Sequence, residues 1–283
     1  ADPVNVGIIY SKTGALAAYG ATYYQGLQAG IDYATGGTGE VNGAKINLTY
    51  ADDGGDPDKA VTAAKDMIGK GYKIIGGTVS SGIALKLAEQ AQQNKVLYIS
   101  GPAATDAIQG INKYTFRSGR QSLQDVATAG TFIDTKGKKV VVFAQDNAFG
   151  QGNVAAVKAV LGAKGATVQS VLVPDGQELT PFARQLIDAK PDMVFVAWAG
   201  ATSGTMWQTL SQQGAFAAAP IVTGLGDAST FGAYGEATSK ISFLNHYFPG
   251  ASGTDVEKKM VASVEKAGAK ADLFTPDASS PGK

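Results

Sequence analysis

Two short loops made of small and hydroxyl-bearing residues are the parts of this sequence whose chemistry suggests a site. The first closes the stretch 73–81 and carries Thr78, Ser80 and Ser81; the second closes the stretch 96–105 with Pro-Ala-Ala-Thr. Their backbone N–H groups and hydroxyls can donate hydrogen bonds, but no strong acid, base or metal ligand accompanies them. A buried anion is stable only where several donors replace its water. The loops therefore suit the binding of a small anionic group rather than its chemical transformation.

Catalytic and metal-binding groups are scarce in the rest of the chain. There is no cysteine and one histidine, His246, so thiolate chemistry is excluded and a Ser-His-Asp triad would have to recruit that residue. The acidic cluster 52–58 lacks the spacing of a calcium loop and is explained by turn and helix-cap chemistry. No glycine-rich run has nucleotide-binding spacing. We expect no catalytic residue, no metal and no cofactor; a hydrolase of doubly wound fold is the enzyme alternative, and turnover of a bound ligand would reveal it.

Charge and hydropathy argue against a nucleic-acid-binding protein and against a membrane-spanning one. The 24 basic and 24 acidic residues balance to a formal net charge of zero, without the basic surface expected of a nucleic-acid-binding protein. No apolar run approaches the roughly 20 residues that span a bilayer. The chain opens directly before a predicted strand, so we expect that a signal peptide has been removed.

The elements that must position the two loops alternate between strands and helices. Each loop follows a continuous apolar run, which is typical of a buried parallel strand, and open α/β sheets hold ligands where such strands end. The first series has strands at 4–10, 46–50, 73–75 and 96–99 and helices at 23–34, 58–70 and 83–94. The second has strands at 140–143, 166–173, 193–197, 220–223 and 241–244 and helices at 123–134, 152–162, 181–189 and 203–213. In the first series Asp56 is the predicted N-cap of a helix with Pro57 at its first position.

Two successive series of this kind predict an α/β protein of two Rossmann-like lobes with parallel central sheets, joined by a hinge. The extended stretches 114–119 and 246–250 are the predicted crossings, and a last helix, 255–268, then returns to the first lobe. We expect residues 1–119 with 250–283 to form the first lobe and 120–249 the second. The ligand is expected in the cleft between them.

Several motifs, in order along the chain, resemble those of one known family. They are Ile8-Ile9-Tyr10-Ser11-Lys12-Thr13-Gly14 with Tyr19-Gly20, Asp52-Asp53 with Pro57 and Ala60, the loop 76–81, the loop 102–105, and Phe149-Gly150-Gln151-Gly152. From residue 4 to about residue 275 the chain resembles the extracytoplasmic solute-binding proteins of branched-chain amino-acid ABC transporters, the leucine/isoleucine/valine-binding type. The resemblance implies the type I periplasmic binding protein fold, a small-molecule ligand and a membrane permease as partner.

The resemblance also implies roles for individual residues. Ser80 and Thr105 would bind the ligand carboxylate through side-chain hydroxyls and neighbouring N–H groups, and Ala103 would offer its carbonyl to the ammonium group of an amino acid. Ser81 and Ala104 would be further ligand-binding residues of these two loops. Tyr19 would lie at the mouth of the cleft. In the second lobe the ligand would meet Phe149, Trp198 and Asp227.

Three departures from the family pattern leave the ligand open. Phe149 stands where the family usually has a tyrosine, so it can pack but cannot donate a hydrogen bond. An aromatic contact after the strand 193–197 is replaced by Ala199 and Gly200 beside Trp198. Asp227 is the only acidic residue in the loop 223–228, where the family binds the ammonium group, and it lies about one residue away from the family's position. An apolar amino acid is predicted if Asp227 faces the cleft, and an aromatic or aliphatic carboxylic acid without an amine if it does not.

The family also normally continues after Phe274 with a helix of the first lobe, whereas residues 275–283 have the composition of a polar tail. A truncation and an unusual variant are both compatible with this ending. We expect a monomeric periplasmic or extracellular protein. The sensor alternative, a ligand-binding receptor ectodomain, uses the same fold; membrane-spanning or DNA-binding segments in the full gene would favour it, and these 283 residues show neither.

Overall fold

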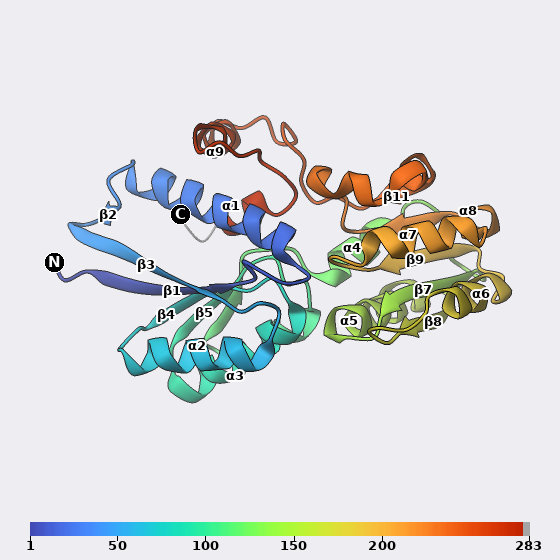
Figure 1. The fold of residues 1–283 in the computed structure, drawn as a ribbon, viewed down its shortest axis with the longest axis horizontal. Coiled ribbons are helices and arrows are strands. Elements are labelled where there is room, and N and C mark those ends of the chain that lie inside the picture. Colours follow the sequence, from blue (N-terminus) through green and yellow to red (C-terminus); the bar gives the residue numbers. More distant parts are fainter. Residues whose placement is uncertain (280–283) are drawn as a thin grey trace. The chain divides into compact units, whose positions relative to one another are not determined.

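The computed structural model describes residues 1–279, which divide into two compact units. The first unit contains residues 1–120 and the chain from Tyr247 onward, and the second contains residues 121–246. Each unit is an α/β structure built on its own sheet (Figure 1). The predicted α/β class with parallel central strands is therefore confirmed.

The first unit is built on a six-stranded sheet. Its strands, in spatial order, are β2 (Glu40–Val41), β3 (Ala44–Asp52), β1 (Val4–Tyr10), β4 (Ile74–Gly77), β5 (Leu97–Ser100) and β6 (Thr115–Arg117). All neighbours pair in parallel except β2 and β3. The strand order reverses at β1, which lies between β3 and β4. In open α/β sheets ligands bind outside the carboxyl ends of the strands at such a reversal, and β4 and β5 end in the two loops predicted to bind an anion.

Helices cover both faces of this sheet. Alternate residues of β1 point to opposite faces: Ile9 packs with α2 (Pro57–Gly69) and α3 (Ser81–Asn94), whereas Ile8 and Tyr10 pack with α1 (Ala17–Thr35) and α10 (Thr275–Ser279). The helix α9 (Asp255–Lys266) packs against α1 (Figure 1). As predicted, the Asp56 side chain caps α2, accepting hydrogen bonds from the N–H groups of Asp58 and Lys59.

The second unit has a five-stranded parallel sheet. The spatial order is β11 (Ile241–Phe243), β10 (Ile221–Thr223), β9 (Met193–Ala197), β7 (Lys139–Gln145) and β8 (Thr167–Val173). One face packs on α4 (Ser122–Ala129) and α5 (Ala148–Val157), and the other on α6 (Thr180–Asp188), α7 (Ser203–Gln212) and α8 (Ala215–Ala218). The strand order reverses at β7, between β8 and β9. The loops that follow β7 and β9 are therefore the expected ligand-facing loops of this unit.

One helix ends before its predicted boundary for an identifiable reason. The helix predicted at 123–134 ends at Ala129, where Thr131 turns its hydroxyl back onto the carbonyl of Thr128, 2.8 Å away, in place of continuing the helix. Helix α1 begins at Ala17, ahead of the periodic stretch 23–34, and Gly20 lets the helix approach the carbonyl of Ser11 where any side chain would collide.

The polar tail predicted after Phe274 is wrong for residues 275–279, which form α10. Ala278 is fully buried against the aromatic side chains of Tyr10 and Tyr23, and the carbonyl of Thr275 would lie 2.1 Å from a Cβ at Gly26 of α1. Tertiary packing onto α1 therefore orders a segment whose composition is that of a loop. The predicted tail residues 280–283 lie outside the described residues. Within residues 1–279 no helix is long and apolar enough to cross a bilayer.

Candidate functional site

The loop after β4 carries two serine hydroxyls into the first turn of α3. Gly77 and Thr78 both have positive φ, +114° and +83°, and the N–H group of Thr78 donates to the carbonyl of Ile9 at 2.8 Å. This sharp turn places Ser80 at the N-cap of α3 and Ser81 at its first position. Both residues therefore lie where the helix dipole favours an anion.

The two serine hydroxyls differ in burial. Ser80 is half-buried, and its side chain makes no capping hydrogen bond to α3. The Ser81 hydroxyl is buried, and among the described residues it has no protein hydrogen-bond partner. A buried hydroxyl without a partner is costly, so the structure brings to this loop a donor that a ligand oxygen would satisfy.

The loop after β5 lies beside the first. The N–H group of Gly101 donates to the carbonyl of Gly77 at 2.8 Å, and that of Ala103 to the carbonyl of Thr78 at 3.3 Å. Ala103, Ala104 and Thr105 are all buried. The Thr105 Oγ1 accepts a hydrogen bond from the N–H group of Ala107 at 3.2 Å, which leaves the hydroxyl proton available to an acceptor. The structure thus brings together Ser80, Ser81, Ala103, Ala104 and Thr105, the five residues of these loops predicted to bind the ligand.

Two arginines that the sequence analysis did not select hold this second loop. Arg117 donates from Nη1 to the carbonyl of Thr105 at 3.0 Å and from Nη2 to that of Ala103 at 2.9 Å. Arg120 donates from Nη1 to the carbonyl of Pro102 at 2.9 Å. The Ala103 carbonyl, predicted to receive an ammonium group, thus already accepts a hydrogen bond from a guanidinium group. These are two of the three arginines in the sequence; Arg117 lies within the predicted crossing 114–119, and Arg120 follows it directly.

Tyr19 lies inside the first unit. Its side chain on α1 is 5% exposed, and its ring meets that of Phe274 edge-on with 5.1 Å between centroids. This packing gives Tyr19 a structural role in joining α1 to the segment before α10. The first unit therefore places Tyr19 in its core.

The acidic residues after β3 serve the turn, as predicted. Asp52 accepts hydrogen bonds from Thr13, Gly54 and Lys12, which outweigh partial burial and lower its pKa to about 2. Burial raises the pKa of Asp53, although the Ser11 hydroxyl donates to its Oδ1 at 2.7 Å. Within residues 1–279 no group of three or more potential ligand side chains is arranged to hold a metal ion.

In the second unit a glutamine joins the loops after β7 and β9. The Gln145 side chain donates from Nε2 to the carbonyl of Ala199 at 3.1 Å, and its Oε1 accepts from the N–H group of Ala199 at 2.9 Å. Phe149 is half-buried in the first turn of α5, whose N-cap Asn147 accepts from the Gly150 N–H group at 2.9 Å. The glutamine bridge fixes the ends of β7 and β9, next to Phe149 and Trp198, to each other.

Trp198 and Asp227 are both buried in the second unit. The indole ring of Trp198 stacks on Phe143 with 5.8 Å between centroids, and its Nε1 donates to Thr202 at 2.9 Å. Asp227 is 0% exposed at the start of the 3₁₀ turn Ala228–Ala233, next to a loop braced by Asn245, whose Nδ2 donates to the Gly226 carbonyl at 3.0 Å. The packing of Trp198 gives it a core role. Phe149, Trp198 and Asp227 follow β7, β9 and β10, so they lie at one edge of this sheet.

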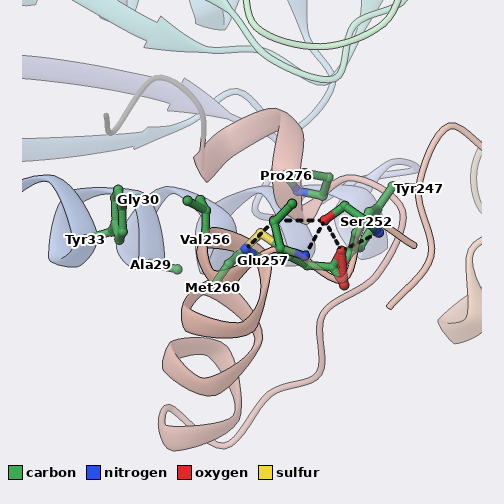
Figure 2. Close-up of a pocket in the computed structure, with 10 residues that line it drawn as sticks. Ala29, Gly30, Tyr33, Tyr247, Ser252, Val256, Glu257, Met260 and Pro276 are labelled. Atoms are coloured by element: carbon green, nitrogen blue, oxygen red, sulfur yellow. Dashed lines mark hydrogen bonds between the residues drawn. The ribbon is translucent and has the colours of Figure 1, made fainter. Parts of the chain in front are cut away.

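A pocket lies elsewhere in the first unit, between α1 and α9. Its volume is about 220 Å³, and its walls include Tyr33 of α1, Met260 of α9, Tyr247 and Pro276 (Figure 2). None of the residues predicted for the carboxylate belongs to its lining. The sequence analysis did not foresee this pocket.

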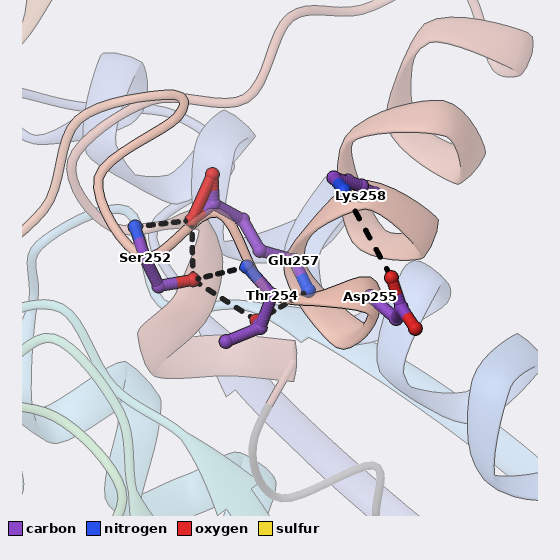
Figure 3. A network of polar contacts seen from close by, with 5 residues as sticks. All are labelled: Ser252, Thr254, Asp255, Glu257 and Lys258. Atoms are coloured by element: carbon purple, nitrogen blue, oxygen red, sulfur yellow. Dashed lines mark hydrogen bonds and ion pairs between the residues drawn. The ribbon is translucent and has the colours of Figure 1, made fainter.

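One rim of that pocket is a hydrogen-bonded turn that caps α9 (Figure 3). The Glu257 carboxylate accepts from the Ser252 hydroxyl at 2.6 Å, from the Ser252 N–H group at 2.8 Å and from the Gly250 N–H group at 2.6 Å. The hydroxyl of the N-cap Thr254 accepts from the Glu257 N–H group at 3.2 Å. The hydrogen bonds from Ser252 lower the pKa of Glu257. The network fastens the segment that enters the first unit at Tyr247 to its next helix.

Comparison with known proteins adds family relationships to this geometry. A family model described as periplasmic binding protein matches residues 3–281. The Leu/Ile/Val-binding protein BraC3 of Rhizobium johnstonii is 29% identical over 197 residues, an alignment that covers 68% of this chain and 53% of that protein. The chain spans little more than half the length of the curated relatives that it matches.

Solved structures show the same fold over nearly the whole chain. A branched-chain amino-acid ABC transporter protein from Rhodopseudomonas palustris is 31% identical with a TM-score of 0.73, covering 99% of this chain and 78% of that one. A solute-binding protein from R. palustris in complex with benzoate is 22% identical with a TM-score of 0.84, again covering 99% and 78%. At that identity the second likeness concerns the fold alone.

Proposed function

This chain belongs to the periplasmic binding protein family, and we propose that it captures a small carboxylate-bearing solute for uptake by an ABC transporter. The family resemblance predicted from the sequence is confirmed, and it is of the branched-chain amino-acid type. The family consists of extracytoplasmic solute-binding proteins rather than enzymes. We propose a membrane permease as the partner that receives the solute.

The observation that carries this proposal is the donor set at the ends of β4 and β5. Ser80, Ser81 and Thr105 bring three hydroxyls to adjoining loops, and the Ser81 hydroxyl is buried without a protein partner in the described part of the chain. A carboxylate stays ionised away from water only if such donors surround it. We assign Ser80, Ser81, Ala104 and Thr105 to the carboxylate.

The second unit would complete the ligand contacts and drive closure. We propose that Phe149 packs on the apolar part of the solute and that Trp198, stacked on Phe143 and bonded to Thr202, holds the loop after β9 in place. A ligand that touches both units favours a closed state by its differential affinity for that state. Solution scattering should then show a smaller radius of gyration with ligand than without; an unchanged radius at saturation would contradict closure.

Different residues favour two classes of ligand, apolar amino acids and carboxylic acids without an amine. Asp227 offers a carboxylate that suits the ammonium group of an apolar amino acid, in keeping with the Leu/Ile/Val-binding relatives. The Ala103 carbonyl bound by Arg117, and the absence of a hydroxyl on Phe149, favour an aromatic or aliphatic carboxylate without an amine. The amino acid is our first candidate and the amine-free carboxylate our second.

A thermal-shift panel separates the two classes. The protein is first unfolded and refolded to remove any carried ligand, then tested with leucine, valine and phenylalanine beside 4-methylpentanoate, 3-phenylpropanoate and benzoate. A ligand present at 100 times its Kd adds about 2.7 kcal/mol of stability. Stabilisation by amino acids alone supports the first candidate, stabilisation by the amine-free acids supports the second, and no stabilisation by any carboxylate contradicts the proposal.

A further inference from the structure

We propose that Arg117, assisted by Arg120, is a positioning residue that sets the geometry of the ligand loop 102–105; this inference rests on the proposed function for its effect on affinity. Arg117 is the last residue of β6 and Arg120 the last residue of the first unit before the chain enters the second. Neither is assigned to contact the solute. Their role lies in the backbone of the loop that would.

The guanidinium groups bind three of the four carbonyls in this loop. Arg117 spans the carbonyls of Ala103 and Thr105 at 2.9 and 3.0 Å, and Arg120 takes that of Pro102 at 2.9 Å. The rigid planar fork of arginine can bridge two acceptors at fixed separation, which the single ammonium of lysine cannot do in the same geometry. The clamp therefore fixes the orientation of successive peptide groups rather than the loop's position alone.

Fixing the carbonyls also fixes the N–H groups on the opposite side of each peptide plane. In a trans peptide the C=O and N–H bonds point in opposite directions. The Pro102 carbonyl faces Arg120 while the Ala103 N–H group of the same peptide points to the Thr78 carbonyl, 3.3 Å away. By the same geometry, Arg117 turns the N–H group of Ala104 away from itself. Donors held in place before the ligand arrives cost less entropy on binding.

The clamp also ties this loop to the segment that leaves the first unit. The N–H group and the hydroxyl of Ser118 donate to the carbonyl of Ser100 at 2.9 and 3.2 Å. A Cβ at Gly119 would lie 2.5 Å from the carbonyl oxygen of Gly101, so a glycine is required for this close approach. Residues 117–120 are thereby fixed to the end of β5 as well as to the loop that follows it.

The test compares Arg117→Lys with the matched substitution Arg184→Lys, which changes an exposed arginine on α6 of the second unit. Amide hydrogen exchange without ligand is the direct readout, because it does not depend on the identity of the solute. In Arg117→Lys the segment 101–108 should exchange at least about tenfold faster while β5 and α3 keep their rates. Arg120→Lys, which retains a donor for one carbonyl, should show a smaller increase.

Titration with leucine and with benzoate adds the functional readout. A probe that binds the wild-type protein should lose roughly tenfold in affinity with Arg117→Lys at a nearly unchanged unfolding midpoint, and none with Arg184→Lys. Unchanged exchange at 101–108, or faster exchange throughout the first unit together with a lowered midpoint, would overturn the positioning role. If Arg117→Lys does not fold, the same readouts on Arg120→Lys decide it. Failure of both probes to bind the wild type counts against the proposed carboxylate ligand, while the exchange result still decides the inference.

Discussion

Replacing Ser81 by alanine should raise the stability of the free protein and lower its affinity for the ligand. The Ser81 hydroxyl is buried and has no protein hydrogen-bond partner among the described residues. Alanine keeps the Cβ and suits the first position of α3. The substitution removes a group that we propose is retained for the ligand and not for folding.

The two effects can be estimated separately. An unpaired buried hydroxyl costs about 1–3 kcal/mol, and the small space left by removing one oxygen offsets part of the gain. A net stabilisation of about 1 kcal/mol corresponds to a rise in unfolding midpoint of about 2–4 °C for a unit of this size. A hydroxyl bonded to a carboxylate contributes about 1.5–3 kcal/mol, so the affinity should fall by about tenfold or more.

The assay is thermal unfolding without ligand together with calorimetric titration of the carboxylate that stabilises the wild type. Thr115→Val is the matched control. The Thr115 hydroxyl is also buried without a protein partner in the described chain, but Thr115 is the first residue of β6, at the end of the strand remote from the ligand loops. It should stabilise the free protein similarly and leave the affinity unchanged. Destabilisation of the free protein by Ser81→Ala, or an unchanged affinity, would refute the reasoning.

Three further substitutions test other parts of the structure. Burial raises the pKa of Asp53, so folding favours its protonated form; stability should fall as the pH rises from about 4 through that pKa. Asp53→Asn should flatten this slope, as measured by denaturant unfolding across pH, and an unchanged slope would assign it to another group. Hydrogen bonds from Ser252 lower the pKa of Glu257. The contribution of its carboxylate to folding stability is therefore present above a pH of about 4.3 and is lost as the pH falls below that value. Glu257→Gln should therefore be less stable than wild type at pH 7 and approach it at pH of about 3; equal stability at neutral pH would show that the network is dispensable. Gly77→Ala would place a Cβ 2.1 Å from the Ile9 carbonyl oxygen at a φ of +114° and should cost about 3 kcal/mol or more in chemical unfolding, whereas a cost below about 1 kcal/mol would show that the loop relaxes.

The strands could be predicted from sequence because both faces of each sheet are covered. Met193–Ala197 is a continuous, buried apolar run, and its boundaries and those of Val4–Tyr10 agree with the predictions. The cap at Asp56 is a purely local signal. Segments whose structure depends on contacts far away in the sequence could not be predicted in this way. Helix α10 has the composition of a loop, and its order depends on the packing of Ala278 against aromatic residues more than 250 positions earlier in the chain.

In the candidate site, too, features with a local sequence signal could be predicted and features that depend on distant contacts could not. The two loops that carry Ser80, Ser81 and Thr105 could be selected because they come after apolar runs, and the family resemblance assigned these residues to the ligand. The clamp of Arg117 on the carbonyls of Ala103 and Thr105 could not, because a side-chain bond to backbone 12–14 residues away leaves no pattern in residue types. Burial of Trp198 against Phe143 was equally hidden, since an aromatic residue after a strand suits a core as well as a binding surface.

The most direct test of the central claim, that this chain binds its solute through an ionised carboxylate, is to compare one ligand with its neutral amide. The acid that gives the largest thermal stabilisation is titrated calorimetrically beside the amide of the same acid, at equal pH and ionic strength. The account predicts that the amide binds at least about a hundredfold more weakly, because the donors of Ser80, Ser81 and Thr105 then face an uncharged group whose NH₂ cannot accept their hydrogen bonds. Equal affinities for the acid and the amide would contradict it.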